Sequence, residues 1–218
     1  MKKIYLSPSD QPANLYAYGN TNEKVVCTEI SAYAEKALKR NGFEVITATS
    51  TSLRTRCSEA DKWGADLYIP VHTNAFNGKV SGTRMICYAL SGEGYKACKA
   101  IYNALAPVTP GKSENITANP GLYEIKTPKA PTAYIEVDFH DVPEVAKWII
   151  EHKEEIGEAI CKGVCNYYGV TYKAKEAPKK ETGKVYRVQV GAYSVKANAE
   201  AMLAKLKQAG FDGFIKEE

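Results

Sequence analysis

His72 is the residue whose position most directly suggests chemistry. It follows an apolar strand pattern at 65–71, ADLYIPV, and opens the segment HTNA. In an open α/β sheet, ligands and catalytic groups gather outside the carboxyl ends of the strands, and an imidazole there can bind a metal or carry a proton. The alternative is a structural histidine, since a single histidine after an apolar strand often serves only in packing.

Two acidic residues lie at positions that suggest either chemistry or structure. Glu23 opens a helical pattern, where the positive end of the helix dipole favours a carboxylate. Glu136 lies in the middle of an apolar strand pattern at 133–139, and His140 shares its face if the strand continues. Without a functional role, Glu23 would be a helix-terminal carboxylate, Glu136 a buried ion-paired carboxylate, and His140 a surface or loop residue.

The elements that must position these residues alternate between strand and helix over the first 170 residues. Strand patterns occur at 3–7, 43–47, 66–72, 82–89 and 133–139, and helical patterns at 23–41, 55–64, 92–106 and 143–168. A loop rich in Gly, Pro and Asn follows the third helical pattern and runs to Pro120. This order predicts an α/β fold with a twisted, mostly parallel sheet flanked by helices.

Composition sets the scale of the protein and its classes of partner. The 218 residues, 44% hydrophobic and 25% charged, fit an ordinary globular protein with one core of about 150 to 200 residues and an appendage. A net charge of +4 is too small to indicate nucleic acid. No apolar run approaches the roughly 20 residues of a membrane span, so neither nucleic acid nor membrane is expected as a partner.

The six cysteines are scattered along the chain and form no C-x-x-C pair. A structural zinc site of the usual kind is therefore not indicated. We expect the cysteines to be mostly buried, free thiols.

The chain divides into three parts by composition. Residues 1–172 form the expected α/β domain. Residues 173–183, KAKEAPKKETG, are rich in charge and lack aromatic and large aliphatic side chains, which is typical of a flexible linker. Residues 184–218 show a strand, a helix and a short strand, which predicts a small C-terminal βαβ unit.

A dense pattern in the first domain resembles a known enzyme family. The pattern R-x3-A-[ND]-x3-A-D-L-x-I-x-x-H-x-N-A is filled at every fixed position between Arg56 and Ala75. IYLSPSDQ, GNTNEK, SGTRMICY and PTAYIEVDF follow the family's other segments in the same order. Over residues 3 to about 170 the chain resembles the zinc-dependent N-acetylmuramoyl-L-alanine amidases, which act on bacterial peptidoglycan.

The resemblance implies roles for individual residues. Glu23 and His72 match zinc-binding residues of the family, and Glu136 matches its general acid and base. A zinc-activated water would attack the carbonyl that joins N-acetylmuramic acid to L-alanine, while Glu136 moves the proton to the departing amine. Asn74 is a candidate to bind the substrate at the oxyanion.

One departure from the family falls on a metal ligand. The family reads P-G-H-G in the first strand loop, with its histidine on zinc, whereas this chain reads Pro8-Ser9-Asp10-Gln11. Asp10 is the predicted replacement, because a carboxylate oxygen can bind zinc, and His140 is the second candidate. Such a carboxylate-rich site would also suit another divalent metal such as manganese.

The C-terminal unit resembles the SPOR domain, a module that binds peptidoglycan glycan strands. The match consists of VQVGAY, the helix NAEAMLAKLKQAGF and the strand DGFI, and it covers the first βαβ half of that domain. A half-domain of this size cannot bury a core of its own, so its folding and binding stay open.

Two other functions remain open on the sequence alone. A degenerate, non-catalytic peptidoglycan-binding protein would have lost catalysis with the first histidine. A zinc exopeptidase of similar α/β design would need an arginine clamp for a chain terminus, for which Arg84 is the candidate.

The expected place of action is the bacterial cell wall, outside the cell. The start of the chain, MKKIYLSPSD, turns polar at Ser7, so no signal peptide is expected. This favours export by release of the phage-lysin type.

Overall fold

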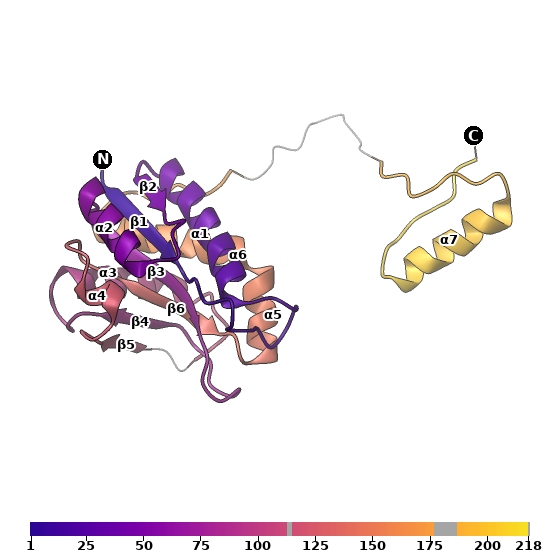
Figure 1. Ribbon diagram of the computed structural model, residues 1–218. Coiled ribbons are helices and arrows are strands. Elements are labelled where there is room, and N and C mark those ends of the chain that lie inside the picture. Colours follow the sequence, from indigo (N-terminus) through magenta and orange to yellow (C-terminus); the bar gives the residue numbers. More distant parts are fainter. Residues whose placement is uncertain (113–114, 177–186, 218) are drawn as a thin grey trace. The chain divides into compact units, whose positions relative to one another are not determined.

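The computed structural model describes residues 1–112, 115–176 and 187–217. The chain splits into two compact units, Met1–Lys175 and Glu176–Glu218 (Figure 1). Each unit is described separately below.

The described part of the first unit contains a six-stranded sheet. Its strands in chain order are β1 (Lys3–Pro8), β2 (Glu44–Thr47), β3 (Leu67–Asn74), β4 (Arg84–Cys87), β5 (Asn115–Ala118) and β6 (Tyr134–Phe139). Their order across the sheet is β2-β1-β3-β6-β4-β5. All neighbouring strands are parallel except the β4–β6 pair, which is antiparallel. The predicted mostly parallel α/β fold is confirmed.

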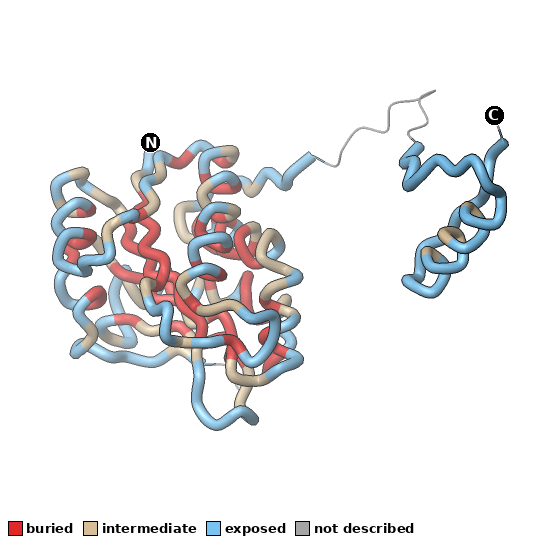
Figure 2. Tube along the Cα trace, turned by 45° about the vertical axis from the view of Figure 1, so that its right-hand side comes forward, coloured by how far each residue is buried: buried red, intermediate tan, exposed pale blue. Residues whose placement is uncertain are grey.

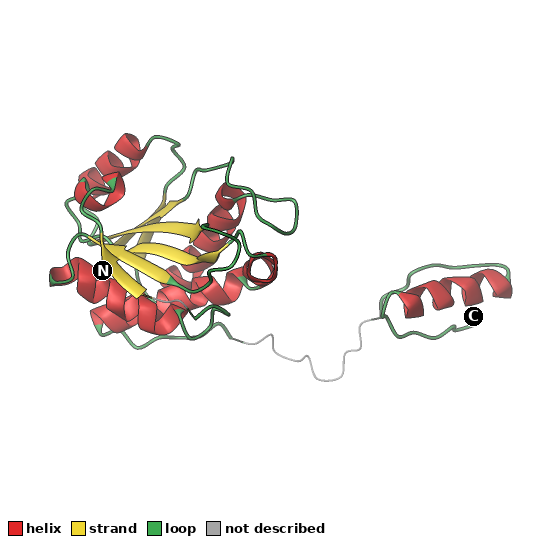
Figure 3. Cartoon of the chain, turned by 90° about the horizontal axis from the view of Figure 1, so that it is seen from below, coloured by secondary structure: helices red, strands yellow, loops and turns green. Residues whose placement is uncertain are grey.

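Helices cover both faces of this sheet (Figure 3). They are α1 (Glu23–Arg40), α2 (Leu53–Trp63), α3 (Gly92–Leu105), α4 (Tyr123–Lys126), α5 (Pro143–Glu151) and α6 (Lys153–Tyr168). The prediction of a single helix at 143–168 is wrong. The helix breaks at His152, whose backbone leaves helical geometry at φ −116° and whose ring stacks on Trp148 with centroids 4.5 Å apart.

β5 lies in the segment that the sequence suggested to be a loop. It is a short edge strand, and its side chains are exposed or only half-buried. An edge strand with no fully buried face carries no clear two-residue hydrophobic pattern, so the sequence offers little signal for it.

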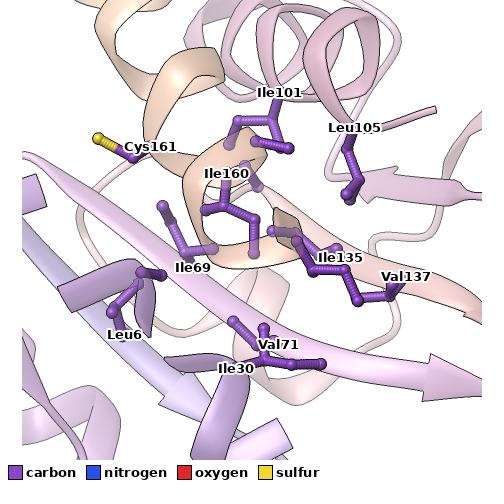
Figure 4. Close-up of a cluster of buried hydrophobic side chains, with 14 of the residues drawn as sticks. Leu6, Ile30, Ile69, Val71, Ile101, Leu105, Ile135, Val137, Ile160 and Cys161 are labelled. Carbon is purple, nitrogen blue, oxygen red and sulfur yellow. The ribbon is translucent and has the colours of Figure 1, made fainter. Parts of the chain in front are cut away.

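The two faces of the sheet bury different side chains, because successive strand residues point in opposite directions. One face packs against α1, α3 and α6 and forms the larger core, shown in Figures 2 and 4. Its strand residues include Leu6, Ile69, Val71, Ile135 and Val137, and its helix residues include Ile30, Ile101 and Ile160. The alternate strand residues therefore face the other side.

The second face packs against α2 and is smaller. Tyr5 of β1 and Tyr68 of β3 stack there with ring centroids 5.3 Å apart, and they contact Cys57 and Ala60 of α2. By the same alternation, His72 and Glu136 belong to this second face.

The cysteine prediction is confirmed. All six cysteines lie in the described part of the chain, and each is buried and free.

The contact between α3 and α6 is close enough to require glycine at position 163. A Cβ added to Gly163 would lie 2.4 Å from Ile101 Cα and 3.1 Å from the Ala100 carbonyl oxygen. Overpacking of this kind costs about 1–3 kcal/mol, more than the roughly 1 kcal/mol by which alanine favours a helix over glycine. The difference between these two effects leads us to expect Gly163→Ala to lower the free energy of unfolding by up to about 2 kcal/mol, measured by urea denaturation.

The neighbouring residue provides the control for this prediction. Lys162 is exposed on the same helix turn, and lysine and alanine are both good helix formers. Lys162→Ala should leave the unfolding midpoint nearly unchanged. An equal loss in both variants would show that tight packing at Gly163 is not the cause.

The second unit contains the helix α7 (Lys196–Gln208). Within 187–217 no strand is formed on either side of it, so the predicted βαβ arrangement is corrected to a single helix with irregular flanks. A strand forms only where a neighbour supplies hydrogen bonds, and apolar side chains such as Val188 and Phe214 stay exposed in this unit. Most of the predicted linker, from 177 on, lies outside the described residues, and the predicted domain boundaries stay predictions.

None of the helices in the described part of the chain has the length and apolar character needed to span a bilayer.

Candidate active site

His72, near the carboxyl end of β3, and Glu136, in the middle of β6, are cross-strand neighbours on two parallel strands. β3 and β6 pair directly at these two positions. On the other side of Glu136, the antiparallel strand β4 places Arg84 opposite it. A row of histidine, glutamate and arginine therefore crosses the second face of the sheet, at the edge where α/β proteins collect catalytic groups.

Glu23 reaches this row from the first turn of α1. Asn22 caps the helix by accepting a hydrogen bond from the Val25 amide at 3.1 Å, which fixes the helix start. The Glu23 side chain is buried and receives the Asn14 side-chain amide at 2.6 Å. Its other oxygen lies 2.8 Å from His72 Nδ1. Burial alone would raise the pKa of Glu23, but hydrogen bonds from His72 and Asn14 lower it.

His72 is held between carboxylates on both sides of its ring. The residue is 6% exposed, and its ring stacks on Tyr134 with centroids 4.7 Å apart. Nδ1 faces Glu23, whereas Nε2 is buried without a hydrogen-bond partner among the described residues. Burial would lower the pKa of His72, but the neighbouring Glu124 and Glu23 carboxylates outweigh it and raise the pKa to about 9.

Glu136 is a half-buried residue whose carboxyl group has one buried, unused oxygen. Its Oε2 makes no hydrogen bond to any residue that the structure describes. Burial raises the pKa of Glu136 to about 7, and the positive charges of His72 and Arg84 only partly oppose this rise. A carboxyl group with a pKa near neutrality can both take and give a proton at physiological pH.

Asp10 lies near the site but is engaged elsewhere. Its carboxylate forms an ion pair with Lys24 at 2.6 Å. The next residue, Gln11, lies beside His72, with 3.4 Å between the side-chain nitrogen of Gln11 and His72 Nδ1. The role of Asp10 as a metal ligand stays a prediction.

His140 and Asn74 lie beside the site. His140 Nδ1 is 2.9 Å from the Thr73 hydroxyl, and its ring stacks on Tyr16. Burial lowers the pKa of His140, which favours a neutral ring. The Asn74 side-chain oxygen accepts a hydrogen bond from the Ala75 amide at 2.8 Å, so it shapes the turn after β3. The predicted contacts of His140 and Asn74 with metal or substrate stay predictions.

Glu124 is a site residue that the sequence did not reveal. It lies in α4 and is 4% exposed. Its Oε2 is 3.9 Å from His72 Nε2. Neither spacing nor periodicity marks this residue, because α4 has only four residues and follows the edge strand β5 after a short turn.

A pocket of about 250 Å³ opens beside these residues. It is lined by Asp10, Gln11, Thr51, Leu53, Arg56, His72, Leu122, Tyr123, Glu124 and Tyr134. His72 and Glu124 therefore border a space that a small group of a substrate can enter.

The donor atoms partly satisfy the needs of a metal ion. Among the described residues, no three His, Cys, Asp or Glu side chains are arranged so that they could hold a metal. Glu23 and His72 nevertheless bring together a carboxylate oxygen and an imidazole nitrogen, both ordinary zinc ligands, 2.8 Å apart. Two donors alone do not complete a zinc site, so the described residues as they lie do not form one.

Comparison with known proteins decides the family. The family model described as N-acetylmuramoyl-L-alanine amidase (Amidase_3) matches residues 9–166, which is most of the chain. The chain belongs to the N-acetylmuramoyl-L-alanine amidase family. The model of the SPOR domain matches residues 169–217 of this amidase. Both resemblances inferred from the sequence motifs are confirmed.

Individual relatives agree with this assignment. The amidase is 25% identical to the sporulation-specific N-acetylmuramoyl-L-alanine amidase of Bacillus subtilis, over 99% of this chain and 84% of that protein. It is 24% identical to the N-acetylmuramoyl-L-alanine amidase CwlM of Bacillus licheniformis, over 99% of this chain and 85% of that protein.

Solved structures show the same fold. The catalytic domain of the amidase CwlV from Bacillus (Paenibacillus) polymyxa superposes with a TM-score of 0.71 at 17% identity, over 78% of this chain and all of that domain (100%). The CwlD amidase from Clostridioides difficile, solved in complex with the GerS lipoprotein, gives a TM-score of 0.68 at 20% identity, over 78% of this chain and 99% of that one.

Proposed function

We propose that this chain hydrolyses the amide bond between N-acetylmuramic acid and L-alanine in peptidoglycan, in a metal-dependent reaction that uses Glu136 as general acid and base. The observation that carries the proposal is the Glu136 carboxyl group. The residue is half-buried, and its Oε2 is buried with no hydrogen-bond partner among the described residues. The group has a pKa near 7 and lies directly across from His72.

Glu23 and His72 are the proposed metal ligands, with Asp10 as the third. Their chemistry favours zinc, although this carboxylate-rich set would also accept another divalent ion. When bound, such an ion polarises the amide carbonyl and makes water a stronger nucleophile. Asp10 would have to exchange its ion pair with Lys24 for the metal.

The residues of the chain then handle the protons. Glu136 takes a proton from the attacking water, whose oxygen bonds to the carbonyl carbon. The C–N bond breaks, and Glu136 gives the proton to the departing amine of L-alanine. Arg84, opposite Glu136, favours the ionised form in which the carboxylate can accept the first proton. Asn74 is proposed to bind the substrate near the oxyanion.

The second candidate function is a non-catalytic peptidoglycan-binding protein. The ion pair between Asp10 and Lys24 favours it, because it occupies the proposed third ligand. Metal content after purification without chelator separates the two functions. About one metal ion per chain supports the enzyme, and a metal-free protein that still binds peptidoglycan supports the binder.

Substitutions of Asp10 test whether it is the third metal ligand. If Asp10 binds the metal, Asp10→Ala should weaken zinc affinity more than His140→Ala. Asp10→His should retain or strengthen that affinity, because a neutral imidazole suits zinc. Titration of metal-free protein with zinc measures all three. Wild-type affinity in Asp10→Ala would assign the third position to another residue.

The SPOR unit extends the proposal to the bacterial cell wall. The presence of a SPOR domain and an amidase domain in one chain supports action on peptidoglycan outside the cell. The phage-type release suggested by the start of the chain stays a prediction.

A further inference from the structure

A second pocket lies along the contact between α2 and α4, which are neighbours in Figure 1. It measures about 360 Å³ and is lined by Arg54, Cys57, Ser58, Asp61, Lys62, Tyr123, Thr127 and Lys129. Tyr123 also lines the pocket beside His72, and its side chain is 37% exposed. The two pockets therefore adjoin at Tyr123, and one ligand can extend from the first into the second.

This second pocket, here called the cationic pocket, carries three positive charges and one negative charge. Arg54, Lys62 and Lys129 are exposed, and none of their side chains makes an ion pair or a hydrogen bond within the described parts of the chain. The Asp61 carboxylate accepts a hydrogen bond from the Lys129 backbone amide at 2.9 Å, which ties the loop after α4 to α2. Glu59, three residues before Lys62, accepts the Tyr5 hydroxyl at 2.7 Å. The positive charge of the pocket is therefore left without an ion-pair partner.

Arg54 lies where helix stability does not favour a cation. α2 begins at Leu53, and Ser52 caps it by accepting a hydrogen bond from the Thr55 amide at 3.3 Å. The first turn of α2 contains no acidic residue. Because the positive end of the helix dipole disfavours a cation there, an anionic ligand would offset a cost that the helix itself does not.

We propose that the cationic pocket binds a carboxylate of the peptide part of the substrate. The inference rests on the proposed function. The carboxyl group of N-acetylmuramic acid is already part of the amide bond that is cut, whereas a peptide keeps a carboxylate at its C-terminus and on each acidic side chain. Arginine and lysine hold such a group by charge-assisted hydrogen bonds. A substrate whose amide bond lies at the first pocket can therefore place a peptide carboxylate beside Arg54, Lys62 and Lys129.

Binding of a peptide without the sugar tests the pocket and requires no hydrolysis. The probe is the synthetic tripeptide L-alanyl-glutamyl-alanine, compared with the same peptide after amidation of both of its carboxylates. Isothermal titration of the full-length chain should give a Kd about 10-fold lower for the acidic peptide than for the amidated one. Added salt should reduce this difference, because it screens exposed charges.

Substitution of the cations identifies the site of binding. Arg54→Gln and Lys62→Gln should each raise the Kd for the acidic peptide about 2–5-fold, the effect typical of an exposed ion pair, and the double variant about 10-fold. Lys126→Gln is the matched control. Lys126 is exposed in α4 but does not line the cationic pocket, so its loss removes the same charge and should keep the wild-type Kd.

Three results would overturn the inference. The first is equal affinity of the wild-type chain for the acidic and the amidated peptide. The second is an equal effect of Lys62→Gln and Lys126→Gln, which would reflect overall charge alone. The third is binding of inorganic phosphate that depends on Arg54 and Lys62 without any preference for the acidic peptide, which would assign the pocket to a phosphate-bearing ligand. The proposed function fails separately, if the chain releases no amino-terminal alanine from peptidoglycan.

Discussion

Glu136→Gln should abolish peptidoglycan hydrolysis while zinc binding and folding persist. General acid–base catalysis contributes about 10² to 10⁴ in rate, and an amide cannot carry the proton from water to the leaving amine. The variant is isosteric and neutral, and burial already favours the neutral form of this carboxyl group. Release of amino groups from purified peptidoglycan measures the rate, and zinc titration checks the metal site.

An exposed strand glutamate serves as the control for this change. Glu44 lies in β2 at the far side of the sheet order, and Glu44→Gln should keep full activity. Wild-type turnover in Glu136→Gln would remove Glu136 from the reaction. Loss of zinc together with activity would instead make it a ligand or a structural residue.

His72→Ala and Glu23→Ala should each lose metal and activity together. The two side chains lie 2.8 Å apart, so each substitution removes one of two adjacent metal-binding atoms. Zinc content is expected to fall from about one ion per chain to a small fraction, and hydrolysis to fall with it. Elemental analysis and the peptidoglycan assay, run on the same preparations, measure both quantities.

For each of these variants, another residue of the same type serves as the control. His152 stacks on Trp148 at the α5–α6 break, and Glu29 pairs with Lys153 on an exposed part of α1. His152→Ala and Glu29→Ala should retain metal and activity. Stoichiometric zinc in His72→Ala or Glu23→Ala would show that the altered residue is not a ligand.

The fold could be predicted where hydrophobic periodicity is strong. The strand that ends near His72 and the helix that begins at Glu23 both carry a buried face, and both form at nearly the expected residues. The sequence did not reveal β5, because the side chains of this exposed edge strand do not alternate between buried and exposed positions. It did not reveal the break at His152 either, because an amphipathic pattern can continue through a helix break. The expected C-terminal strands failed for another reason, since pairing partners are not encoded in a local pattern.

The candidate site could be predicted only in part. His72 and Glu136 each end or occupy a strongly patterned strand, and the structure places them side by side. The ion pair of Asp10 with Lys24 and the approach of Glu124 depend on loops and on a four-residue helix. Such contacts depend on tertiary packing, and spacing along the chain does not reveal them.

Analysis of the products released from purified peptidoglycan tests the central claim most directly. Zinc-loaded protein should generate free amino-terminal L-alanine and intact glycan strands without new reducing ends, and a chelator should stop this release. Protein that binds zinc at about one ion per chain yet releases no amino-terminal alanine would contradict the account, as would products cut within the glycan strand or within the stem peptide.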